Sequence, residues 1–439
     1  MSINKFSNFI FDDYKLDMNK LSVELAYSCD DSLKFVEKLT WNREFPNLDN
    51  KSLESSLQLL HLILGVSYFK AYLAPNVSIK QYSIDEPQAD FLNNLYKNGL
   101  GEFLYMNNLD FGTVAKFTST KPRGENLNQT VQNPNRKVLV PISGGKDSLL
   151  TAEILSSAKI DFTPIYISTD SNYPKILDSF PQEPIIVTRQ IARELIEANK
   201  SGAFNGHVPF SAIIDSILII TAQIYGFTDI VLSHESSANE ATTFYKGESI
   251  NHQYSKTDEF DQQLQNYVNT YVNPGIKIFS LLSNLSELDI NRLFVEKGLF
   301  AKYSGKWSSC NVANYKLGHN TESLSWCGKC SKCANAFLLL APFIDKSELL
   351  EMFSGKNLLT DADMKNIFRS LLGETETKPF ECVAEINELR QAMDILKASA
   401  DWPEAADYPS SALPRSSQVS TVATLPDGYQ RAIDSFTKA

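Results

Sequence analysis

The chain has 439 residues, of which 43% are hydrophobic, and it carries a formal net charge of −11 with a pI near 5.1. This length exceeds what one hydrophobic core usually spans and indicates two or more domains. The acidic balance argues against binding to duplex nucleic acid, which requires clustered Lys and Arg. The apolar stretch 213–227 is interrupted by Asp215 and Gln223, and the acidic N-terminal segment lacks the core of a signal peptide. We therefore expect a cytoplasmic protein with neither a nucleic acid nor a membrane as partner.

Residues 1–117 are expected to form a small α+β domain. Apolar and polar residues alternate over 20–41 around a polar turn at 29–32, which predicts a β-hairpin. Helix-like stretches follow at 53–73 and 88–107. His61 lies on an apolar face of the first, which favours a satisfied core histidine over a ligand. Residues 118–136 are polar and lack periodicity, so they predict a linker or loop.

From residue 137 to 300, apolar strand-like segments alternate with helix-like segments. The expected strands are 138–142, 164–168, 184–188, 229–233 and 276–280, and the expected helices are 148–158, 189–199, 211–226 and 259–271. This alternation predicts an α/β domain with a doubly wound parallel sheet. Ligands of such sheets bind beyond the carboxyl ends of the strands, so the loops after Ile142, Ile167, Leu232 and Phe279 should border one crevice.

The strand 138–142 leads into a short glycine-containing loop and then a helix. The loop reads Ser143, Gly144, Gly145, Lys146, Asp147, Ser148. Two glycines let the backbone approach an anion, and the first amides of the helix point at it with the positive end of the helix dipole. The loop is too short for a Walker A motif. Asp147 would repel a bare phosphate, so we expect a nucleotide with bound Mg²⁺; a connection without a ligand is the alternative.

Many polar residues follow the strand 229–233. They comprise His234, Glu235, Asn239 and Glu240, and then Asn251, His252 and Lys256. Such side chains could move protons, hold Mg²⁺ or bind the phosphate or carboxylate of a substrate. A solvated loop is the alternative. His207 is a candidate for a second edge of the same crevice, or only a turn residue.

Four of the six cysteines have the spacing of a metal site within a helical region at 301–400. They form C-x16-C-x2-C-x2-C, with Cys310, Cys327, Cys330 and Cys333. Zinc fits a closed site of four thiolates, and an iron–sulfur cluster is the rival. We expect a structural site that ties the C-terminal helices to the crevice. Cys29 and Cys382 stand apart and are interpreted as packing residues. Residues 401–439 are rich in Pro and Ser and predict a weakly ordered tail.

The loop at 143–148 resembles the pyrophosphatase loop of the N-type ATP pyrophosphatases, or PP-loop enzymes, related to the adenine nucleotide α-hydrolases. This resemblance implies cleavage of ATP to AMP and pyrophosphate, with transfer of the adenylyl group to a substrate oxygen. It implies that Lys146 and the loop amides bind pyrophosphate. It also implies that residues 167–170, including Ser168 and Thr169, border the adenine.

Seven separated segments together resemble one branch of that superfamily. They are SGGKDS at 143–148, NGHVPFSAI at 205–213, SHESSANE at 233–240, NHQYSK at 251–256, SSCN at 308–311, WCGKCSKC at 326–333 and KPFECVAE at 378–385. The branch is the ATP-dependent UDP-N-acetylmuramoyl-L-alanyl-L-glutamate epimerase family of peptidoglycan synthesis. The resemblance covers about residues 15–395.

For this chain, the resemblance implies adenylation of the terminal L-glutamate carboxylate of a UDP-muramoyl dipeptide. Removal of the α-proton, reprotonation on the other face and release of AMP would follow. The acid and base candidates are His234, Glu235, Glu240 and His252. The candidate substrate ligands are His207, Asn239, Asn251 and Lys256.

Three other functions remain open. A 7-cyano-7-deazaguanine synthase also joins such a loop to four cysteines, but the N-terminal domain and the NHQYSK segment argue against it. A tRNA-modifying sulfurtransferase or ligase fits the loop but poorly fits the acidic chain. A zinc-stabilised nucleotide sensor would bind ATP without releasing pyrophosphate.

Overall fold

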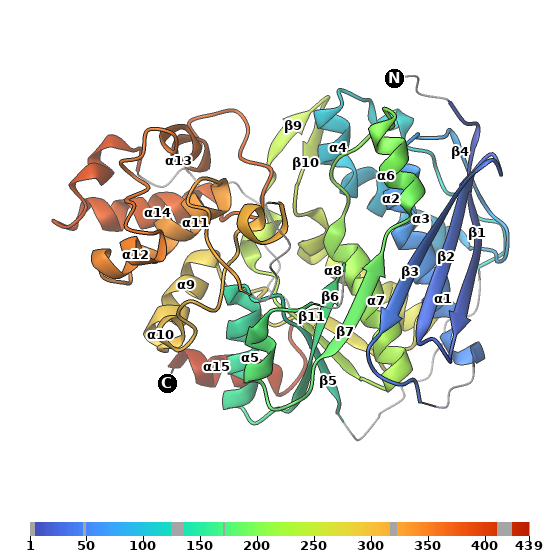
Figure 1. Ribbon diagram of the computed structural model, residues 1–439, viewed down its shortest axis with the longest axis horizontal. Helices are drawn as coiled ribbons and strands as arrows, with labels where there is room; N and C mark the ends of the chain where they lie inside the picture. The colour runs from blue at the N-terminus through green and yellow to red at the C-terminus, as the bar shows by residue number, and fades with distance from the viewer. Residues whose placement is uncertain are drawn as a thin grey trace.

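The computed structural model describes residues 5–46, 50–123, 136–169, 172–316, 323–410 and 424–438. They are organised around a nine-stranded sheet with the order β11-β8-β5-β6-β7-β3-β2-β1-β4 (Figure 1). Five strands are mutually parallel: β5 (Val138–Pro141), β6 (Phe162–Ser168), β7 (Ile185–Gln190), β8 (Asp229–Leu232) and β11 (Lys277–Ser280). The others are β1 (Asn8–Asp17), β2 (Ser22–Cys29), β3 (Leu33–Trp41) and β4 (Asn76–Ile79). The protein is therefore a mixed α/β protein with one large sheet.

The five strands predicted between residues 138 and 280 are all present, each within two residues of its expected bounds. The predicted hairpin is confirmed as β2 and β3, which pair antiparallel. The hairpin does not form a sheet of its own, because β3 pairs antiparallel with β7, with Trp41 opposite Val187. A buried ion pair crosses this junction, in which Arg189 Nε lies 2.5 Å from Glu37 Oε1. The N-terminal strands thus extend the parallel sheet.

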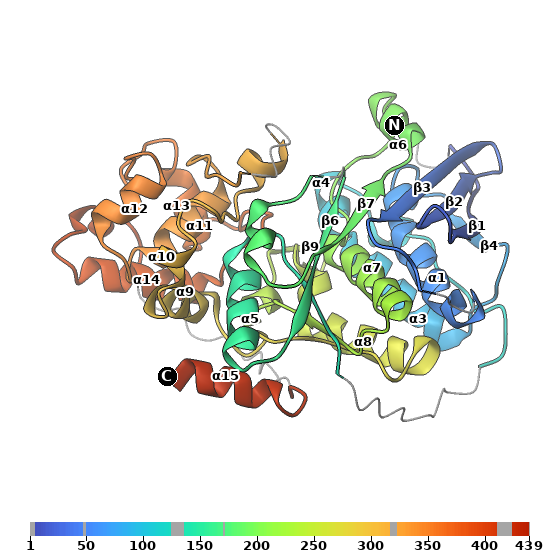
Figure 2. The same cartoon turned by 60° about the horizontal axis from the view of Figure 1, so that its bottom comes forward.

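Helices cover both faces of the sheet. Successive residues of a strand point to opposite sides, and apolar residues on both sides pack against these helices. Leu139, Ile165 and Val187 face one core, which contains α1 (Asn50–Leu64), α2 (Val66–Phe69), α3 (Glu86–Gly99), α4 (Gly101–Met106), α7 (Phe210–Tyr225) and α8 (Asp258–Tyr267). Val140 and Val231 face the other, which contains α5 (Lys146–Ser157), α9 (Glu287–Glu296) and C-terminal helices (Figure 2). The alternation of apolar residues thus encodes two cores with one sheet between them.

His61 of α1 is a core histidine, as the sequence predicts. Its side chain is fully buried, with Nε2 3.0 Å from the Ala26 carbonyl oxygen and Nδ1 3.1 Å from the Tyr82 hydroxyl. Burial lowers the pKa of His61 to about 4, so its ring is neutral at physiological pH.

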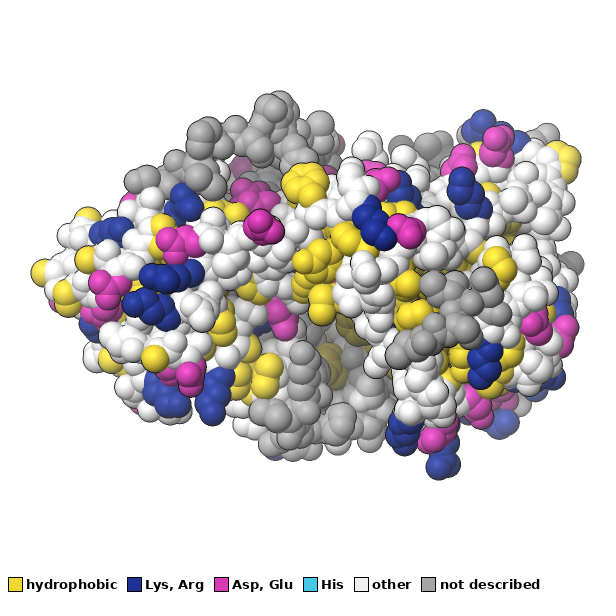
Figure 3. All heavy atoms as spheres, turned by 90° about the horizontal axis from the view of Figure 1, so that it is seen from above, with side chains coloured by type: hydrophobic (Ala, Val, Ile, Leu, Met, Phe, Trp, Pro, Cys, Tyr) yellow, Lys and Arg dark blue, Asp and Glu magenta, His cyan; other side chains and the backbone are white. Residues whose placement is uncertain are grey.

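The order of the parallel strands reverses at β5, which has β6 on one side and β8 on the other. The loops that leave β5 and β8 therefore diverge at the carboxyl edge of the sheet, the usual place of a ligand in such folds. Seen from above Figure 1, the surface is hollowed near its middle, between the side with α12 to α14 and the side with β1 to β4 (Figure 3).

The C-terminal region is helical and packs against α5 and α9. It contains α10 (Leu299–Lys302), α11 (Ser331–Leu340), α12 (Lys346–Met352), α13 (Lys365–Leu371) and α14 (Ile386–Lys397). Another short helix, α6 (Arg193–Lys200), follows β7. Within the described ranges, no helix combines the length and apolar character needed to cross a membrane.

The expectation of a weakly ordered tail needs correction for residues 424–438. Helix α15 (Tyr429–Lys438) lies beside α5, and Tyr429, Ala432 and Ile433 are buried in the second core. The apolar residues recur at helical spacing, which the Pro and Ser content of the preceding segment obscured. That segment, 411–423, lies outside the described residues.

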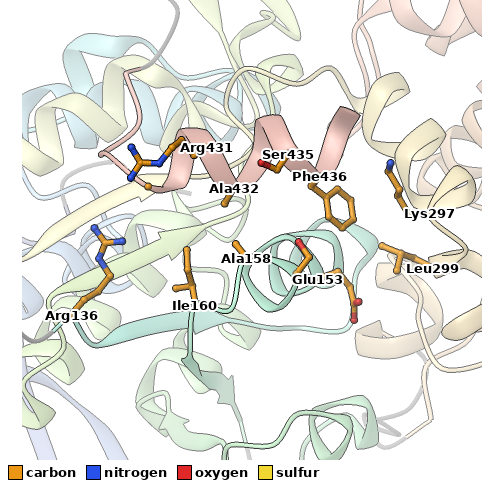
Figure 4. A pocket seen from close by; sticks show the side chains of 12 residues that line it. Arg136, Glu153, Ala158, Ile160, Lys297, Leu299, Arg431, Ala432, Ser435 and Phe436 are labelled. Carbon is orange, nitrogen blue, oxygen red and sulfur yellow. The ribbon is translucent and has the colours of Figure 1, made fainter. Parts of the chain in front are cut away.

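A cavity of about 800 Å³ lies between α15 and α5 (Figure 4). Basic side chains of Arg136, Lys297 and Arg431 line it together with Glu153. Arg136 and Ile160 lie just before the parallel strands β5 and β6, so the cavity is at the amino edge of the sheet. It is therefore separate from the loops that follow the strands.

Candidate active site

The loop after β5 is tightly packed. Gly144 has φ +87°, and a Cβ there would lie 2.2 Å from Leu324 Cδ1. Its carbonyl oxygen accepts a hydrogen bond from the Ser308 backbone amide at 3.1 Å. Gly145 is extended and caps α5, whose first turn is closed by a Ser148 hydroxyl bond to the Gly145 carbonyl at 3.0 Å. The glycine at 144 is therefore required by both backbone conformation and space.

Lys146 holds a buried positive charge at the start of α5. Its Nζ lies 2.7 Å from Asp147 Oδ1 and 3.0 Å from Glu287 Oε1. Burial opposes the charged form, but the two carboxylates outweigh it and raise the pKa of Lys146. Asn335 Nδ2 donates to the same Glu287 oxygen at 3.0 Å. Helix α11 thus fixes the carboxylate that positions the loop lysine.

Glu235 and Lys256 are charged or chargeable groups close to this loop. Burial raises the pKa of Glu235, and the charges of Asp147 and Glu287 raise it further. Lys256 is partly buried, but Cys382, Glu235 and Asp147 outweigh the effect of burial and raise its pKa. The structure therefore brings residues after β5 and β8 into one electrostatic cluster, as the predicted crevice requires.

Two of the other three acid and base candidates, His234 and Glu240, form ion pairs with neighbouring side chains. His234 Nδ1 lies 3.4 Å from Asp261 Oδ2, and this carboxylate outweighs burial and raises the pKa of the histidine. Glu240 forms a short ion pair with the largely buried Lys378. Both contacts reduce the freedom of these side chains to carry a proton to a ligand.

Two candidate substrate ligands make local hydrogen bonds. The Asn239 side chain donates to Asp258 Oδ2 at 3.1 Å and accepts from the Asp258 amide at 3.0 Å. The Asn251 side chain donates to the Ala238 carbonyl at 2.8 Å. These contacts shape the loop after β8 and the start of α8.

His207 and His252 come together around a glutamate that the sequence did not single out. Glu102 Oε2, from α4, lies 2.5 Å from His252 Nδ1 and 3.4 Å from His207 Nδ1, and the two rings are 4.6 Å apart. Two ligands of one metal ion, with bonds of about 2.0–2.2 Å, lie about 3 Å or more apart. The 2.5 Å contact is therefore a direct hydrogen bond rather than the edge of a metal centre.

Cys382, interpreted from the sequence as a packing residue, lies next to this group. Lys256 Nζ donates to Cys382 Sγ at 3.4 Å, and Lys332 Nζ donates to the Cys382 carbonyl at 2.5 Å. His252 lies close enough to the sulfur to favour its thiolate. Burial favours the thiol, but Lys256, His252 and Lys332 outweigh it and lower the pKa of Cys382 to about 5. The sequence signal was its place in the KPFECVAE segment; no local pattern relates position 382 to 102 or 252.

The four clustered cysteines converge as predicted and could hold a metal ion. The Sγ separations are 3.7 Å for Cys310–Cys330, 3.7 Å for Cys327–Cys333 and 3.6 Å for Cys330–Cys333. A tetrahedral ion with metal–sulfur bonds of about 2.3 Å requires edges of roughly 3.8 Å. These three separations are close to that edge, and all four sulfur atoms lie within 4.8 Å of one another. The backbone amide of Ser308, two residues before Cys310, donates the hydrogen bond to the Gly144 carbonyl oxygen in the loop after β5.

Ser168 and Thr169 lie at the carboxyl end of β6, beside β5. The Ser168 hydroxyl donates to the Asn172 carbonyl at 2.9 Å, whereas Thr169 is exposed. Asp170, at the end of the proposed adenine border, lies outside the described residues.

Comparison with known proteins identifies relatives over most of the chain. Residues 1–281 match the family model of the MurL N-terminal domain, and residues 306–418 match that of the MurL C-terminal domain. A protein of Xanthomonas oryzae pv. oryzae named UDP-N-acetyl-alpha-D-muramoyl-L-alanyl-L-glutamate epimerase is 36% identical over 412 residues, which are 92% of this chain and 88% of that protein. Proteins with the same name from a Micromonospora species and from Salinispora tropica are 32% and 31% identical over 410 residues, again 92% of this chain and 90% and 88% of theirs.

Proposed function

The chain belongs to the MurL family, and we propose that it is the epimerase that converts the terminal L-glutamate of UDP-N-acetyl-α-D-muramoyl-L-alanyl-L-glutamate to D-glutamate. The names of the relatives support this activity over the deazaguanine, sulfurtransferase and sensor alternatives. D-glutamate in this precursor serves peptidoglycan synthesis, and we place the enzyme in the cytoplasm, where ATP is available.

We further propose that ATP drives the reaction through the loop after β5, in a fold of the PP-loop type. One observation supports this. Residues Gly144 to Ser148 lie where the order of the parallel strands reverses, and Lys146 among them carries a buried positive charge. In this proposal, Lys146 and the loop amides bind the pyrophosphate part of ATP, while Ser168 and Thr169 border the adenine. Mg²⁺ bound with ATP would neutralise phosphate charge, with Asp147 as its carboxylate ligand.

The chemical need for ATP lies in the acidity of the substrate. An ionised carboxylate disfavours removal of the neighbouring α-proton because a second negative charge would develop next to the first. Transfer of AMP to the carboxylate removes its charge and makes its carbonyl electron-withdrawing. A base can then take the proton, an acid can return one to the other face, and water releases AMP.

Among the four acid and base candidates, Glu235 is favoured. It has a raised pKa and can hold a proton to donate, and it interacts with Asp147 of the loop. The other three candidates are held in ion pairs: His234 with Asp261, Glu240 with Lys378 and His252 with Glu102. Lys256 and His207 are proposed to bind the substrate carboxylate or phosphate.

We propose zinc for the four-cysteine site, with a structural role. Its thiolate separations fit a tetrahedral ion, and Ser308 and Asn335 link its neighbourhood to Gly144 and Glu287. Zinc in such a closed site supplies folding energy rather than a reactive water.

The function is tested by incubating the protein with ATP, Mg²⁺ and the UDP-muramoyl dipeptide that ends in L-glutamate. The expected products are AMP, pyrophosphate and the D-glutamate epimer, measured by chromatography and by the chirality of glutamate after acid hydrolysis. Absence of D-glutamate would refute the proposal. AMP formation that requires carboxydeazaguanine and ammonia would instead favour the synthase.

A further inference from the structure

We propose that Cys382 is a catalytic residue whose thiolate carries the α-proton on one face of the glutamyl Cα, with His252 and Glu102 as its positioning residues. The proposal rests on the epimerase function above. It assigns a task to the KPFECVAE segment, which the PP-loop chemistry leaves without one.

The geometry supports a thiolate at this position. Lys256 Nζ lies 3.4 Å from Cys382 Sγ, and the nearby His252 ring also favours the thiolate. The His252 ring is oriented by Glu102, whose Oε2 lies 2.5 Å from Nδ1. A cysteine with an adjacent histidine that a carboxylate orients is the arrangement that keeps a thiol ionised and fixed in direction.

The three segments of this group converge from distant parts of the chain. Glu102 lies on α4, His252 follows β10 (Glu248–Ile250), and Cys382 precedes α14. A merely structural cysteine lies among apolar side chains, as Cys29 does, where burial raises the pKa of the thiol to about 12. Cys382 is half-buried and meets two charged groups and an imidazole.

The position relative to the loop after β5 fits a proton carrier. Lys256, which contacts Cys382, also interacts with Glu235 and Asp147, so Cys382 is one side chain away from the proposed adenylation site. Lys256 would bind the reacting glutamyl group between Cys382 and Glu235. Both chargeable groups therefore interact with one cation, and proton exchange on two faces requires two such groups.

The Cys382 thiolate takes the α-proton from the adenylated L-glutamyl group and becomes a thiol, while the C–H electron pair passes into the enolate of the activated acyl group. The Glu235 carboxylic acid gives its proton to the opposite face of Cα, which restores the carbonyl and yields the D centre. Hydrolysis releases AMP. The Cys382 thiol then loses its proton to solvent, and Glu235 regains one from solvent.

The test separates activation from proton transfer in Cys382→Ser and Cys382→Ala. Three rates are measured with the full chain: substrate-dependent ATP–pyrophosphate exchange, D-glutamate formation, and deuterium incorporation at Cα in D₂O. We expect exchange within about threefold of the unmodified chain and a loss of D-glutamate formation by about 100-fold or more, the usual range for a proton-transfer residue. Cys29→Ala is the matched control and should keep all three rates.

Three outcomes would overturn the proposal. D-glutamate formation within about threefold of the unmodified chain would show that the thiol is dispensable. Joint loss of exchange and epimerisation in a folded variant would place Cys382 in activation instead. If the unmodified chain itself forms no D-glutamate, the proposed function fails, which is a distinguishable result.

A measurement on the unmodified chain guards against variants that do not fold. Alkylation by iodoacetamide at pH 6.5 is followed by peptide mass spectrometry. We expect Cys382 to react at least about tenfold faster than Cys29, and substrate with ATP should protect it. Equal rates at the two cysteines would contradict a positioned thiolate.

Discussion

Lys146 Nζ and Glu287 Oε1 lie 3.0 Å apart, and both side chains are almost completely buried. The pair connects the loop after β5 with α9, and Asn335 connects it onward to α11. Lys146 therefore has two separable contributions, one to folding and one to the binding of ATP.

Lys146→Met should lower the free energy of unfolding by about 3–5 kcal/mol, because Glu287 would remain buried without its cation. Urea unfolding measures this loss, and pyrophosphate release should also disappear. In the double variant with Glu287→Gln, stability should recover while pyrophosphate release stays absent. Lys306→Met, at an exposed position, should change neither. Recovery of pyrophosphate release in the double variant would contradict a role of Lys146 in ATP binding.

Asp147→Asn should abolish AMP formation, because the amide is a poor ligand for Mg²⁺ next to the phosphates. Rates measured across a range of Mg²⁺ concentrations test this. The matched control is Asp161→Asn, an exposed position before β6, which should leave AMP formation unchanged. Undiminished turnover in Asp147→Asn would refute the account of the loop.

Removal of metal with a strong chelator should lower the melting temperature and reduce activity, because structural zinc contributes folding energy directly. Elemental analysis should find one zinc ion per chain. Cys330→Ser should lose this ion, whereas Cys29→Ala should retain it. Visible charge-transfer bands in the purified protein would indicate an iron–sulfur cluster instead of zinc.

The pH dependence of kcat/KM should rise through about pH 5 as the Cys382 thiolate forms. It should fall at higher pH as Glu235, whose pKa is raised, loses its proton, and in any case above about pH 9. The lowered pKa of Cys382, about 5, makes its thiolate available above that pH, and the raised pKa of His252, about 9, keeps its imidazolium charged below that pH. Lys256, His252 and Lys332 face the thiolate, and Glu102 faces His252. Lys256→Met should shift the acid limb to higher pH, because Lys256 is the cation that lowers the pKa of Cys382 most.

The same shifts affect stability in opposite directions. The Cys382 contribution is present at high pH and is lost as pH falls through about 5, because its folded pKa lies below its usual value of 9.0. The His252 contribution is complete below its usual pKa of 6.5 and is lost as pH rises through about 9. Unfolding of Cys382→Ser and His252→Gln across pH 4–10 should separate them. An unchanged acid limb of the stability profile in Cys382→Ser would exclude Cys382, and an unchanged alkaline limb in His252→Gln would exclude His252.

Arg189→Met should lower the free energy of unfolding by about 3–5 kcal/mol, because Glu37 would remain buried between β3 and β7 without its cation. In the double variant of Arg189→Met with Glu37→Gln, most of the lost free energy of unfolding should be restored. Lys38→Met is the matched control on the same strand, since its exposed pair with Glu24 contributes at most about 1 kcal/mol. Equal losses in Arg189→Met and Lys38→Met would contradict this role.

Much of the fold follows from sequence periodicity. The strands between 138 and 280 are short apolar runs, and the helices between them repeat their apolar residues at helical spacing. The pairing of β3 with β7 did not follow, because alternation reveals a strand but not its neighbour. The hairpin of β9 (Thr243–Tyr245) and β10 was also missed, since three-residue strands leave too little pattern.

The residues of the candidate site also include some that the sequence predicts and some that it does not. The phosphate loop and the cysteine cluster are local motifs, so sequence spacing predicts their geometry. Cys382, Glu102 and Glu287 act through partners that lie more than 100 residues away, such as Glu102 and His252, which are 150 apart. A single cysteine or glutamate outside a spaced motif gives no information about which distant residue it contacts in the fold.

The junction of β3 and β7 also has a consequence for synthesis on the ribosome. Glu37 and Arg189 are separated by 152 residues, which take about 8–30 s to translate at roughly 5–20 residues per second. Until then β3 presents an unpaired edge with a buried acidic residue, and such edges attract other chains. Yield in cells should therefore depend on translation speed and chaperone supply between these two positions.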